Sequence, residues 1–263
     1  METIDLIIGA GEVGRSIYNV ISQTYPNTFI RDTEPLEIDG QIRYLHIAIP
    51  YTGNRFIEIV NNYIAEYSPR VTIVHSTVAP GTTAQLTVSA VHSPVIGKHP
   101  NLEGGITTFE KWVCGKGSEE VAEYLKAAGI NAIPFSDPLI TEVGKLLDTT
   151  RYGLNIGFAQ EQARICRKYG IPYETVVSAY QKNYNRGYQE LGMGYVTQPV
   201  LTPGVIGGHC VMPNIEILKK HFHSEFFDSI VHSNQLQKKN ADLISKYDPI
   251  KNKERKLKNN FKR

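Results

Sequence analysis

Cysteine is scarce in this chain of 263 residues, and the three cysteines lie far apart. Cys114, Cys166 and Cys210 form no C-x-x-C pair, so we expect neither a disulfide framework nor a zinc site, and the spacing suits a reducing cytoplasm. No apolar run approaches the roughly 18 residues that a membrane span needs. The N-terminus enters a strand at once instead of a signal peptide. We therefore expect a cytoplasmic protein without a metal site or a membrane segment.

An excess of charge of one sign is also lacking, since the net charge is only +2. Residues 246–263 hold eight of the 28 basic residues and two of the 26 acidic ones, so this end carries +6 and the remainder −4. The body of the chain therefore gives no electrostatic reason to expect nucleic acid as a partner. We interpret residues 247–263 as a solvated basic C-terminal tail.

The first half of the chain alternates apolar segments with helical patterns, and 41% of all residues are apolar, enough for a buried core. Strands are expected at residues 4–8, 28–30, 44–49 and 71–74, near 91, and at 112–114 and 132–135; helices are expected around 17–21, 56–64 and 119–128. Strands that alternate with helices predict βαβ units and a parallel sheet. We expect a Rossmann-type α/β domain over residues 1–136.

The second half has a different pattern, in which helical periodicity dominates. One long helix is expected at 138–169, and further helices at 173–184, 213–222 and 225–246, with a glycine-rich stretch at 187–208 between them. The pattern predicts an all-helical domain over residues 137–246, built on the long central helix.

The segment Gly9-x-Gly11-x-x-Gly14 follows the first expected strand and precedes the first expected helix. Its glycines permit, in order, a tight turn, close approach of a pyrophosphate to the backbone, and close packing of helix on strand. Asp32 ends the second expected strand, where its carboxylate can accept a hydrogen bond from a ribose 2′-hydroxyl and would repel a 2′-phosphate. The pattern predicts NAD binding, although Arg31 weakens the preference for NAD over NADP.

A second motif is the glycine-rich segment 203–213, PGVIGGHCVMP, which ends in a cysteine just before an expected helix. Paired glycines let the backbone pass close to a ligand and leave the next side chain exposed. A helix N-terminus lowers the pKa of a thiol and favours the nucleophilic thiolate. We therefore predict a reactive Cys210, the alternative being a buried, inert cysteine. Cys114, in an apolar strand, and Cys166, on a helix, fit that alternative better.

Glu142, Lys145 and Thr149 fall on one face of the long expected helix. A lysine beside a cofactor cleft can stabilise a developing alkoxide or act as a base. The alternative is a solvated Glu–Lys pair on the helix surface. Because the neighbouring positions 146, 147 and 156 are Leu, Leu and Ile, we favour a functional lysine.

These motifs share their order with a known family. The order is the glycine loop, then STVAPGTT at 76–83, the helix with Glu142 and Lys145 continuing to Asn-Ile at 155–156 and Gln-Glu at 160–161, and finally GGHC at 207–210. Over roughly residues 4–245 this resembles the UDP-glucose/GDP-mannose dehydrogenase family. The histidine before Cys210 is most like the UDP-N-acetylmannosamine dehydrogenase branch.

The resemblance implies a four-electron oxidation of a sugar-nucleotide alcohol by NAD, through an aldehyde, a thiohemiacetal and a thioester to a carboxylate. It implies that Cys210 is the nucleophile, that Lys145 stabilises the oxyanion, and that Thr77 lies near the nicotinamide and a catalytic water. It also implies a homodimer formed through the helix at 138–169.

The chain departs from the family pattern in four respects. Thr149 stands where the family usually has Asn, and Asn214 where it usually has an acid. The family's glutamate after the fifth or sixth strand has no clear equivalent, Glu103 being a displaced candidate. We expect the family's C-terminal sugar-nucleotide domain to be absent. These departures make a single two-electron oxidation, a smaller substrate or a site completed by a partner subunit plausible.

The expected site residues form three groups. Those for the cofactor are Gly9, Gly11, Glu12, Val13, Gly14, Asp32, Pro50, Ser76 and Thr77; the catalytic ones are Cys210, Lys145, Thr77, Thr149 and Asn214; those for substrate are Arg186, His209 and Glu103. Arg186 suits a phosphate or carboxylate, although its segment 183–188 is equally well explained as a polar loop between helices.

Two other functions remain open. One is a two-electron dehydrogenase similar to the 3-hydroxyacid and 6-phosphogluconate enzymes, which use a lysine on the long helix; HSPVIG at 92–97 faintly resembles their substrate loop. The other is a non-catalytic dinucleotide-binding protein. We favour the cysteine-dependent dehydrogenase, acting on a small-molecule alcohol or a nucleotide sugar.

Overall fold

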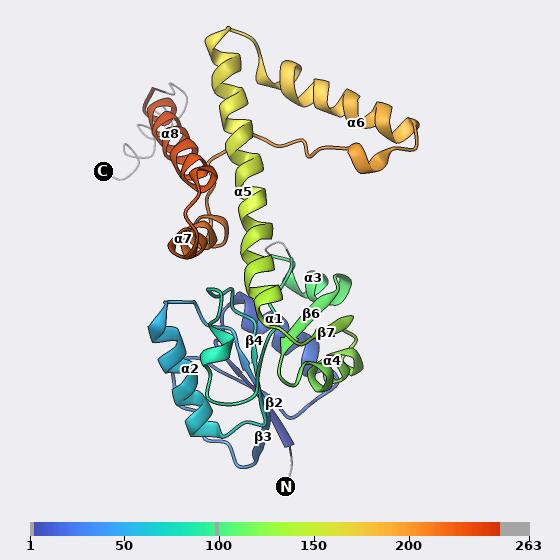
Figure 1. Ribbon diagram of the computed structural model, residues 1–263, viewed down its shortest axis with the longest axis vertical. Coiled ribbons are helices and arrows are strands. Elements are labelled where there is room, and N and C mark those ends of the chain that lie inside the picture. The colour runs from blue at the N-terminus through green and yellow to red at the C-terminus, as the bar shows by residue number, and fades with distance from the viewer. Residues whose placement is uncertain (1–2, 98–99, 248–263) are drawn as a thin grey trace, which may run out of the picture. The chain divides into compact units, whose positions relative to one another are not determined.

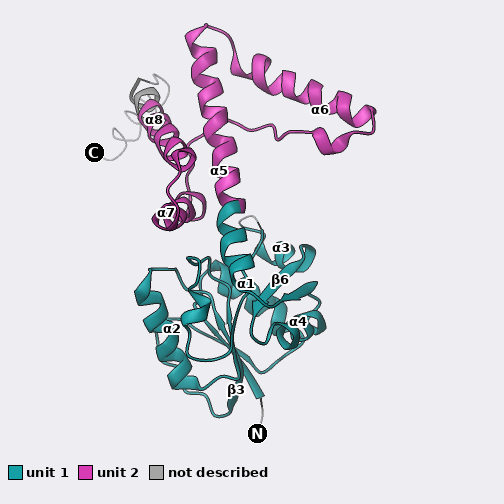
Figure 2. Cartoon of the chain, in the orientation of Figure 1, with its two compact units in different colours: residues 1–147 teal, residues 148–263 magenta. Residues whose placement is uncertain are grey.

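The computed structural model describes residues 3–97 and 100–247, so all of the expected basic tail but residue 247 lies outside the described residues. The chain forms two compact units, Met1–Leu147 and Asp148–Arg263 (Figure 2). The sequence places the domain boundary at 136/137, whereas the compact units divide inside the long helix.

The first unit contains a seven-stranded sheet in the order β2-β1-β3-β4-β5-β6-β7. The strands are β1 (Thr3–Ile8), β2 (Thr28–Arg31), β3 (Gln41–Ile47), β4 (Val71–Val74), β5 (Ala90–His92), β6 (Lys111–Gly115) and β7 (Ala132–Phe135). Every neighbouring pair is parallel except β5–β6. The Rossmann-type prediction is therefore confirmed, with one antiparallel pair that the alternation of elements does not reveal.

Helices cover both faces of this sheet (Figure 1). Helices α1 (Glu12–Ile21), α3 (Leu102–Thr108) and α4 (Ser118–Ala127) pack on one face, and α2 (Asn54–Tyr67) packs on the other. On α1, the side chains of Ile17 and Ile21 are one turn apart and fully buried. Each such side chain contributes about 1.5–3 kcal/mol of transfer free energy, so apolar spacing determines which face of each helix meets the sheet.

The strand order reverses between β1 and β3, because the chain runs outward from β1 to β2 and then returns to the other side of β1. In open α/β sheets, ligands bind outside the carboxyl ends of the strands at such a switch point. The segment that begins at Gly9 follows β1 directly, so the fold places the glycine loop there.

The second unit is helical, as predicted. Helix α5 (Leu139–Lys168) extends into it, and a π-helical turn (Glu174–Ala179), α6 (Tyr180–Glu190), α7 (Val211–His221) and α8 (Glu225–Tyr247) follow. Ile206, Ile215 and Ile230 form its small buried core. None of the helices in residues 3–97 and 100–247 is long and apolar enough to cross a membrane.

The helix expected to end at residue 184 continues to Glu190, so the interpretation of residues 183–188 as a loop is wrong. A glycine inside a helix costs only about 1 kcal/mol relative to alanine, and Gly187 therefore does not end α6. The rings of Tyr184 and Tyr188, one turn apart on this helix, lie 4.7 Å from centroid to centroid.

Candidate functional site

The glycine loop is packed tightly at two positions and open at the third. Gly9 has φ +102°, and a Cβ there would lie 2.6 Å from the carbonyl oxygen of Ala48. A Cβ on Gly14 would lie 1.8 Å from the carbonyl oxygen of Gly9, whereas a Cβ on Gly11 would meet no atom within 4 Å. The fold itself therefore requires glycine at positions 9 and 14, and position 11 is the point that a ligand can approach.

The two charged residues at the end of β2, Arg31 and Asp32, have different hydrogen-bond partners. Asp32 Oδ1 accepts a hydrogen bond from the backbone N–H of Ala10, at 3.1 Å, so this carboxylate lies at the glycine loop. Arg31 binds α2 instead, donating to Glu66 Oε1 at 2.6 Å and to the hydroxyl of Tyr67. Burial alone would lower the pKa of Arg31, but these hydrogen bonds raise it. The arginine is thus engaged by α2 as a permanent cation.

The loops after β3 and β4 are bonded to each other. Ser76 Oγ donates to the carbonyl of Ile49 at 2.6 Å, and the N–H of His75 donates to the carbonyl of Ile47 at 2.8 Å. Pro50 is exposed and Thr77 is half-buried. All residues expected to bind the cofactor, including Glu12 and Val13 in the first turn of α1, therefore lie on loops or turns that follow the adjacent strands β1, β2, β3 and β4.

Glu142, near the start of α5, is fully buried and binds the segment that follows Thr77. Its carboxylate accepts hydrogen bonds from the N–H of Gly81 (2.6 Å), the N–H of Thr83 (2.8 Å) and the hydroxyl of Thr83 (2.6 Å). The alternative of a solvated Glu–Lys pair is therefore wrong for Glu142. The glutamate instead fixes the lysine-bearing helix to the STVAPGTT segment.

We expect Glu142→Gln to lower the free energy of unfolding of the first unit by about 3 kcal/mol, because an amide N–H₂ would face donors and leave buried groups unpaired. Urea denaturation followed by the fluorescence of Trp112, the only tryptophan, measures this unit. The matched control is Glu123→Gln, which removes only an exposed pair with Lys126 and should change stability by less than about 0.5 kcal/mol. Equal effects of the two substitutions would contradict the assigned role of Glu142.

Lys145 is half-buried, one helical turn beyond Thr141. Thr141 Oγ1 is hydrogen bonded to Nδ1 of His92 at 2.9 Å, and Nε2 of His92 donates to the carbonyl of Ser76 at 3.0 Å. Burial lowers the pKa of His92 to about 4 and that of Lys111 to about 7, and the positive charge of Lys145 contributes to both shifts. Lys145 therefore lies close enough to the buried bases His92 and Lys111 for its charge to lower the pKa of both.

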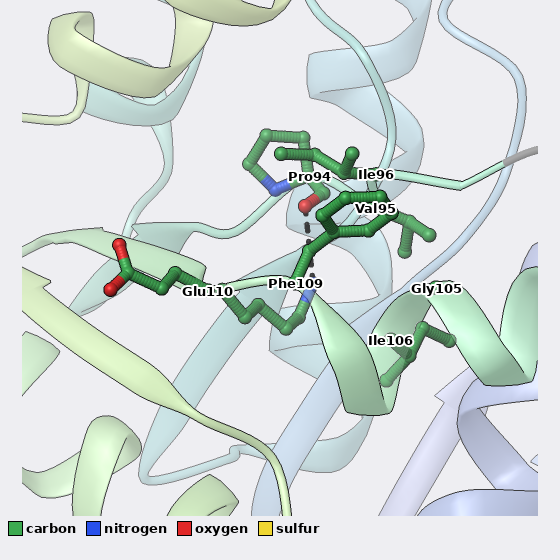
Figure 3. A pocket seen from close by; sticks show the side chains of 8 residues that line it. Pro94, Val95, Ile96, Gly105, Ile106, Phe109 and Glu110 are labelled. Carbon is green, nitrogen blue, oxygen red and sulfur yellow. Dashed lines mark hydrogen bonds between the residues drawn. The ribbon is translucent and has the colours of Figure 1, made fainter. Parts of the chain in front are cut away.

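Lys111 is buried on β6 and donates from Nζ to two carbonyls, of Ser93 at 2.8 Å and of Pro94 at 3.2 Å, the latter bond drawn in Figure 3. A neutral amine has two N–H donors, so the two carbonyls satisfy the uncharged form of Lys111. The hollow drawn in Figure 3, between the 94–96 segment, α3 and β6, contains none of the expected site residues. It is a narrow apolar space beside the lysine and not a candidate cofactor site.

Two buried histidines on β3 and after β4 extend this group of bases. Nδ1 of His46 and Nε2 of His75 are hydrogen bonded at 3.0 Å, and Nδ1 of His75 donates to the carbonyl of Ser93 at 2.9 Å. Nε2 of His46 lies 3.2 Å from the hydroxyl of Tyr124, which donates to Asp5. Burial lowers the pKa of both histidines, that of His46 to about 4. The sequence interpretation missed this network.

We expect the stability of the first unit to rise with pH in two windows. His46 and His92 have pKa values of about 4 when folded and 6.5 ordinarily, so the unfolded chain binds more protons between these values and stability is lost as pH falls from 6.5 to 4. The pKa of Lys111 is about 7 instead of 10.5, so stability rises again from pH 7 to 10.5. Each group contributes up to about 1.4 kcal/mol per pH unit.

Urea denaturation at several pH values, again with Trp112 fluorescence, measures these slopes. His46→Gln should reduce the slope of the free energy of unfolding against pH between pH 4 and 6.5. His223 is exposed, so the control substitution His223→Gln should leave this slope as it is in the unchanged chain. A stability that is flat between pH 4 and 6.5 would rule out neutral buried histidines.

Cys210 is exposed in the second unit and is the N-cap residue of α7, whereas Cys114 and Cys166 are buried. The N-cap position and the exposure agree with what the GGHC segment predicts. His209 before it is also exposed.

The two departures from the family pattern in this unit contact each other. Asn214, on α7, donates from Nδ2 to the hydroxyl of Thr149 on α5 at 3.1 Å, and both side chains are buried. The other expected substrate residues are engaged locally: Arg186 is exposed on α6 and donates to Asn183 at 3.0 Å, and Glu103 on α3 accepts from Asn19 of α1 at 2.6 Å.

Comparison with known proteins finds one family match and several similar structures. Residues 140–240 match the central domain of the UDP-glucose/GDP-mannose dehydrogenase family. A UDP-D-ManNAc dehydrogenase from Pyrococcus horikoshii is similar in structure, with a TM-score of 0.69 and 16% identity over 89% of this chain and 68% of that one. A UDP-N-acetyl-mannosamine dehydrogenase from Staphylococcus aureus gives 0.70 and 14% over 93% and 70%.

A 3-hydroxyisobutyrate dehydrogenase from Mycobacterium tuberculosis has a TM-score of 0.60 and 12% identity over 92% of this chain and 94% of that one. No curated protein matches the sequence. At these identities the structural likeness shows the fold, and the match over 140–240 covers the helix with Lys145 and the segment with Cys210. The family match is confined to residues 140–240, which are similar to the central domain of UDP-glucose/GDP-mannose dehydrogenases.

Proposed function

We propose that this protein is an NAD-dependent dehydrogenase that oxidises an alcohol with Cys210 as nucleophile and Lys145 as the group that accepts or stabilises charge. The observation that carries the proposal is the exposure of Cys210 at the amino end of α7, inside the family's central domain, while the other two cysteines are buried. A thiol at a helix amino end is a favoured nucleophile. The wide spacing of the three cysteines along the sequence also fits the reducing cytoplasm expected from the sequence.

The chain's own residues suit a dinucleotide. The open position at Gly11 admits a pyrophosphate to the amino end of α1, and Asp32 at the glycine loop suits a ribose diol. Because Arg31 is bound to Glu66 and Tyr67, it does not offer its charge to a 2′-phosphate. We therefore propose NAD in preference to NADP. When bound, the nicotinamide accepts the hydride that leaves the alcohol carbon.

The proposed reaction assigns one task to each side chain. Lys145, in its neutral form, takes the hydroxyl proton as the alcohol becomes an aldehyde. The thiolate of Cys210 adds to the aldehyde carbon, and Lys145 in its protonated form stabilises the oxyanion so produced. A second hydride passes to a second molecule of NAD and leaves a thioester on Cys210, and hydrolysis by water releases the carboxylate and the thiol. Thr77 positions that water in this scheme.

The pair Thr149–Asn214 supports a second candidate, a two-electron oxidation that ends at the aldehyde or ketone. Hydrolysis of a thioester needs a base to activate water, and an amide hydrogen bonded to a hydroxyl supplies none. The 3-hydroxyisobutyrate dehydrogenase neighbour has the same fold over nearly all of its own length. A non-catalytic dinucleotide-binding protein is the third candidate. The substrate is accordingly a nucleotide sugar or a smaller alcohol, for which Arg186, His209 and Glu103 remain proposed contacts.

We also propose a homodimer that forms through α5. Exposed apolar side chains at Leu154, Phe158 and Ile165 are spaced by four and seven residues, so they share one face of this helix. Single exposed apolar residues are ordinary, but three large apolar side chains on one helix face favour an interface. Sedimentation equilibrium measures the resulting mass directly.

Titration with the two dinucleotides, followed by assay of an alcohol panel, tests the proposed function. We expect NAD to bind at least about tenfold more tightly than NADP, and Asp32→Ala to reduce that ratio, because the carboxylate repels the 2′-phosphate. The control is Asp39→Ala, an exposed acid beyond β2, which should leave the ratio unchanged. Tight NAD binding without NADH formation from any alcohol would favour the non-catalytic candidate, and equal binding of NADP would contradict the proposed cofactor.

A further inference from the structure

The segment 203–206, which leads into the GGHC motif, lies outside any helix or strand and is hydrogen bonded to side chains of helices α5 and α8. Ile206 is 3% exposed, and the segment belongs to no sheet. Backbone N–H and C=O groups that are buried without a partner each cost about 1–3 kcal/mol, and a helical domain has no neighbouring strand to pair with them. The N–H of Gly204 donates to the carbonyl of Thr202 at 2.8 Å. Side chains bind the N–H of Ile206 and the carbonyls of Pro203, Gly204 and Ile206.

Three amide side chains provide those partners, and we call them the amide clamp. Asn234 on α8 acts like a neighbouring strand, since its Oδ1 accepts from the N–H of Ile206 at 2.8 Å and its Nδ2 donates to the carbonyl of Ile206 at 3.0 Å. Gln160 on α5 donates to the carbonyl of Gly204 at 2.7 Å.

Gln237, one turn beyond Asn234 on α8, donates to the carbonyl of Pro203 at 2.7 Å. Two members of the amide clamp, Gln160 and Asn234, are also linked to each other, and Gln160 is linked to Ser233. Ser233 Oγ donates to Oε1 of Gln160 at 2.8 Å, and Nε2 of Gln160 lies 3.4 Å from Oδ1 of Asn234. The three amides thus bind consecutive peptide groups of one segment.

The other end of the motif is fixed by α7. Cys210 occupies the N-cap position of this helix. Val211 and Ile215 pack against α5 at Gly153, where an added Cβ would lie 2.8 Å from Val211 and 3.0 Å from Ile215. Only residues 207–209 separate the clamped Ile206 from Cys210. A three-residue connection between two fixed ends leaves the cysteine little freedom.

We propose that Gln160, Asn234 and Gln237 are positioning residues for Cys210: they hold the 203–206 segment so that the thiol stays at the amino end of α7. The proposal rests on the proposed function insofar as it makes Cys210 the nucleophile, but the placement of the thiol does not depend on turnover.

The first test measures the native rate of Cys210 alkylation by iodoacetamide, resolved by peptide mass spectrometry. We expect Asn234→Ala to slow alkylation of Cys210 by at least about threefold, because a released segment no longer holds the thiol at its exposed position at the amino end of α7. Cys114 and Cys166 are buried and report unfolding in the same sample. Unchanged alkylation of Cys210 with both buried cysteines still protected overturns the proposal.

Gln237→Met is the second variant, in case Asn234→Ala exposes the buried cysteines. Oε1 of Gln237 is buried without a partner among the described residues, so a methionine of similar length removes that unpaired oxygen along with the bond to Pro203. Stability should therefore stay within about 1 kcal/mol while Cys210 alkylation slows. Gln235→Met, at an exposed position two residues away on α8, is the matched control and should match the unchanged chain. Equal alkylation rates in Gln237→Met and Gln235→Met overturn the proposal.

Assay of the second oxidation separates this proposal from the proposed function. In an active enzyme, Asn234→Ala should lower kcat for an aldehyde substrate by at least about tenfold, with the Kd for NAD unchanged. If the unchanged chain has no turnover, the proposed function fails, while slowed alkylation still supports the clamp.

Discussion

Replacement of Cys210 by alanine is expected to stop carboxylate formation while NAD binding remains intact. Without the thiol, no thiohemiacetal forms, so there is no tetrahedral carbon that can give up the second hydride. Loss of a covalent nucleophile costs about a thousandfold or more in kcat. The measurement is the number of NADH molecules formed per alcohol consumed, which we expect to fall from two to at most one, together with the mass of an acyl adduct on the unchanged enzyme.

Cys166→Ala is the matched control for Cys210→Ala, because it removes a buried thiol that has no part in the proposed chemistry. It should leave the NADH count unchanged. Two NADH molecules per alcohol from Cys210→Ala would contradict the covalent scheme. One NADH from both the unchanged chain and Cys210→Ala would instead establish the two-electron candidate, in agreement with the missing acid at Asn214.

Gly14→Ala is expected to have the largest effect on folding, a loss of about 4 kcal/mol or more in the first unit. The added Cβ would lie 1.8 Å from the carbonyl oxygen of Gly9, and neither backbone can move without breaking the loop between β1 and α1. Losses of this size are exceptional for single substitutions. Urea denaturation with Trp112 fluorescence measures the loss.

Gly11→Ala tests the same loop without the clash. Gly11 has φ −70° and open space around its Cβ position, so alanine should change the free energy of unfolding by less than about 1 kcal/mol. The methyl group would nevertheless stand where we propose that the pyrophosphate meets the backbone, and the Kd for NAD should rise at least about tenfold. A destabilised Gly11→Ala, or one that binds NAD normally, would show that the loop has another role.

Much of the fold follows from local patterns that the sequence displays openly. The apolar strand at residues 4–8, the glycines at 9, 11 and 14, and the long helix from 138 to 169 each depend on a few neighbouring residues, and the structure confirms them. The observed exposure of Cys210 agrees with the prediction for the same reason, since paired glycines and the start of a helix are local features of the sequence.

What the sequence analysis missed depends on contacts between distant segments. His46, His75, His92 and Lys111 come from different strands or their ends, and only the register of those strands brings the four side chains together. Helical periodicity placed Glu142 on a face with Lys145, but could not show that the face meets residues 81–83. The antiparallel pairing of β5 with β6 has the same cause, because spacing along the chain carries no direction of pairing.

The order of strands in the first unit also determines how this unit folds. Strand β1 pairs with β2 and β3, and β3 with β4, all in parallel, so each pairing must enclose a crossover segment before any ladder hydrogen bond forms. Such non-local pairings raise the contact order and slow the search, whereas the contacts within helices form early. We therefore expect the sheet to assemble in the millisecond-to-second range, more slowly than any helix that packs on it.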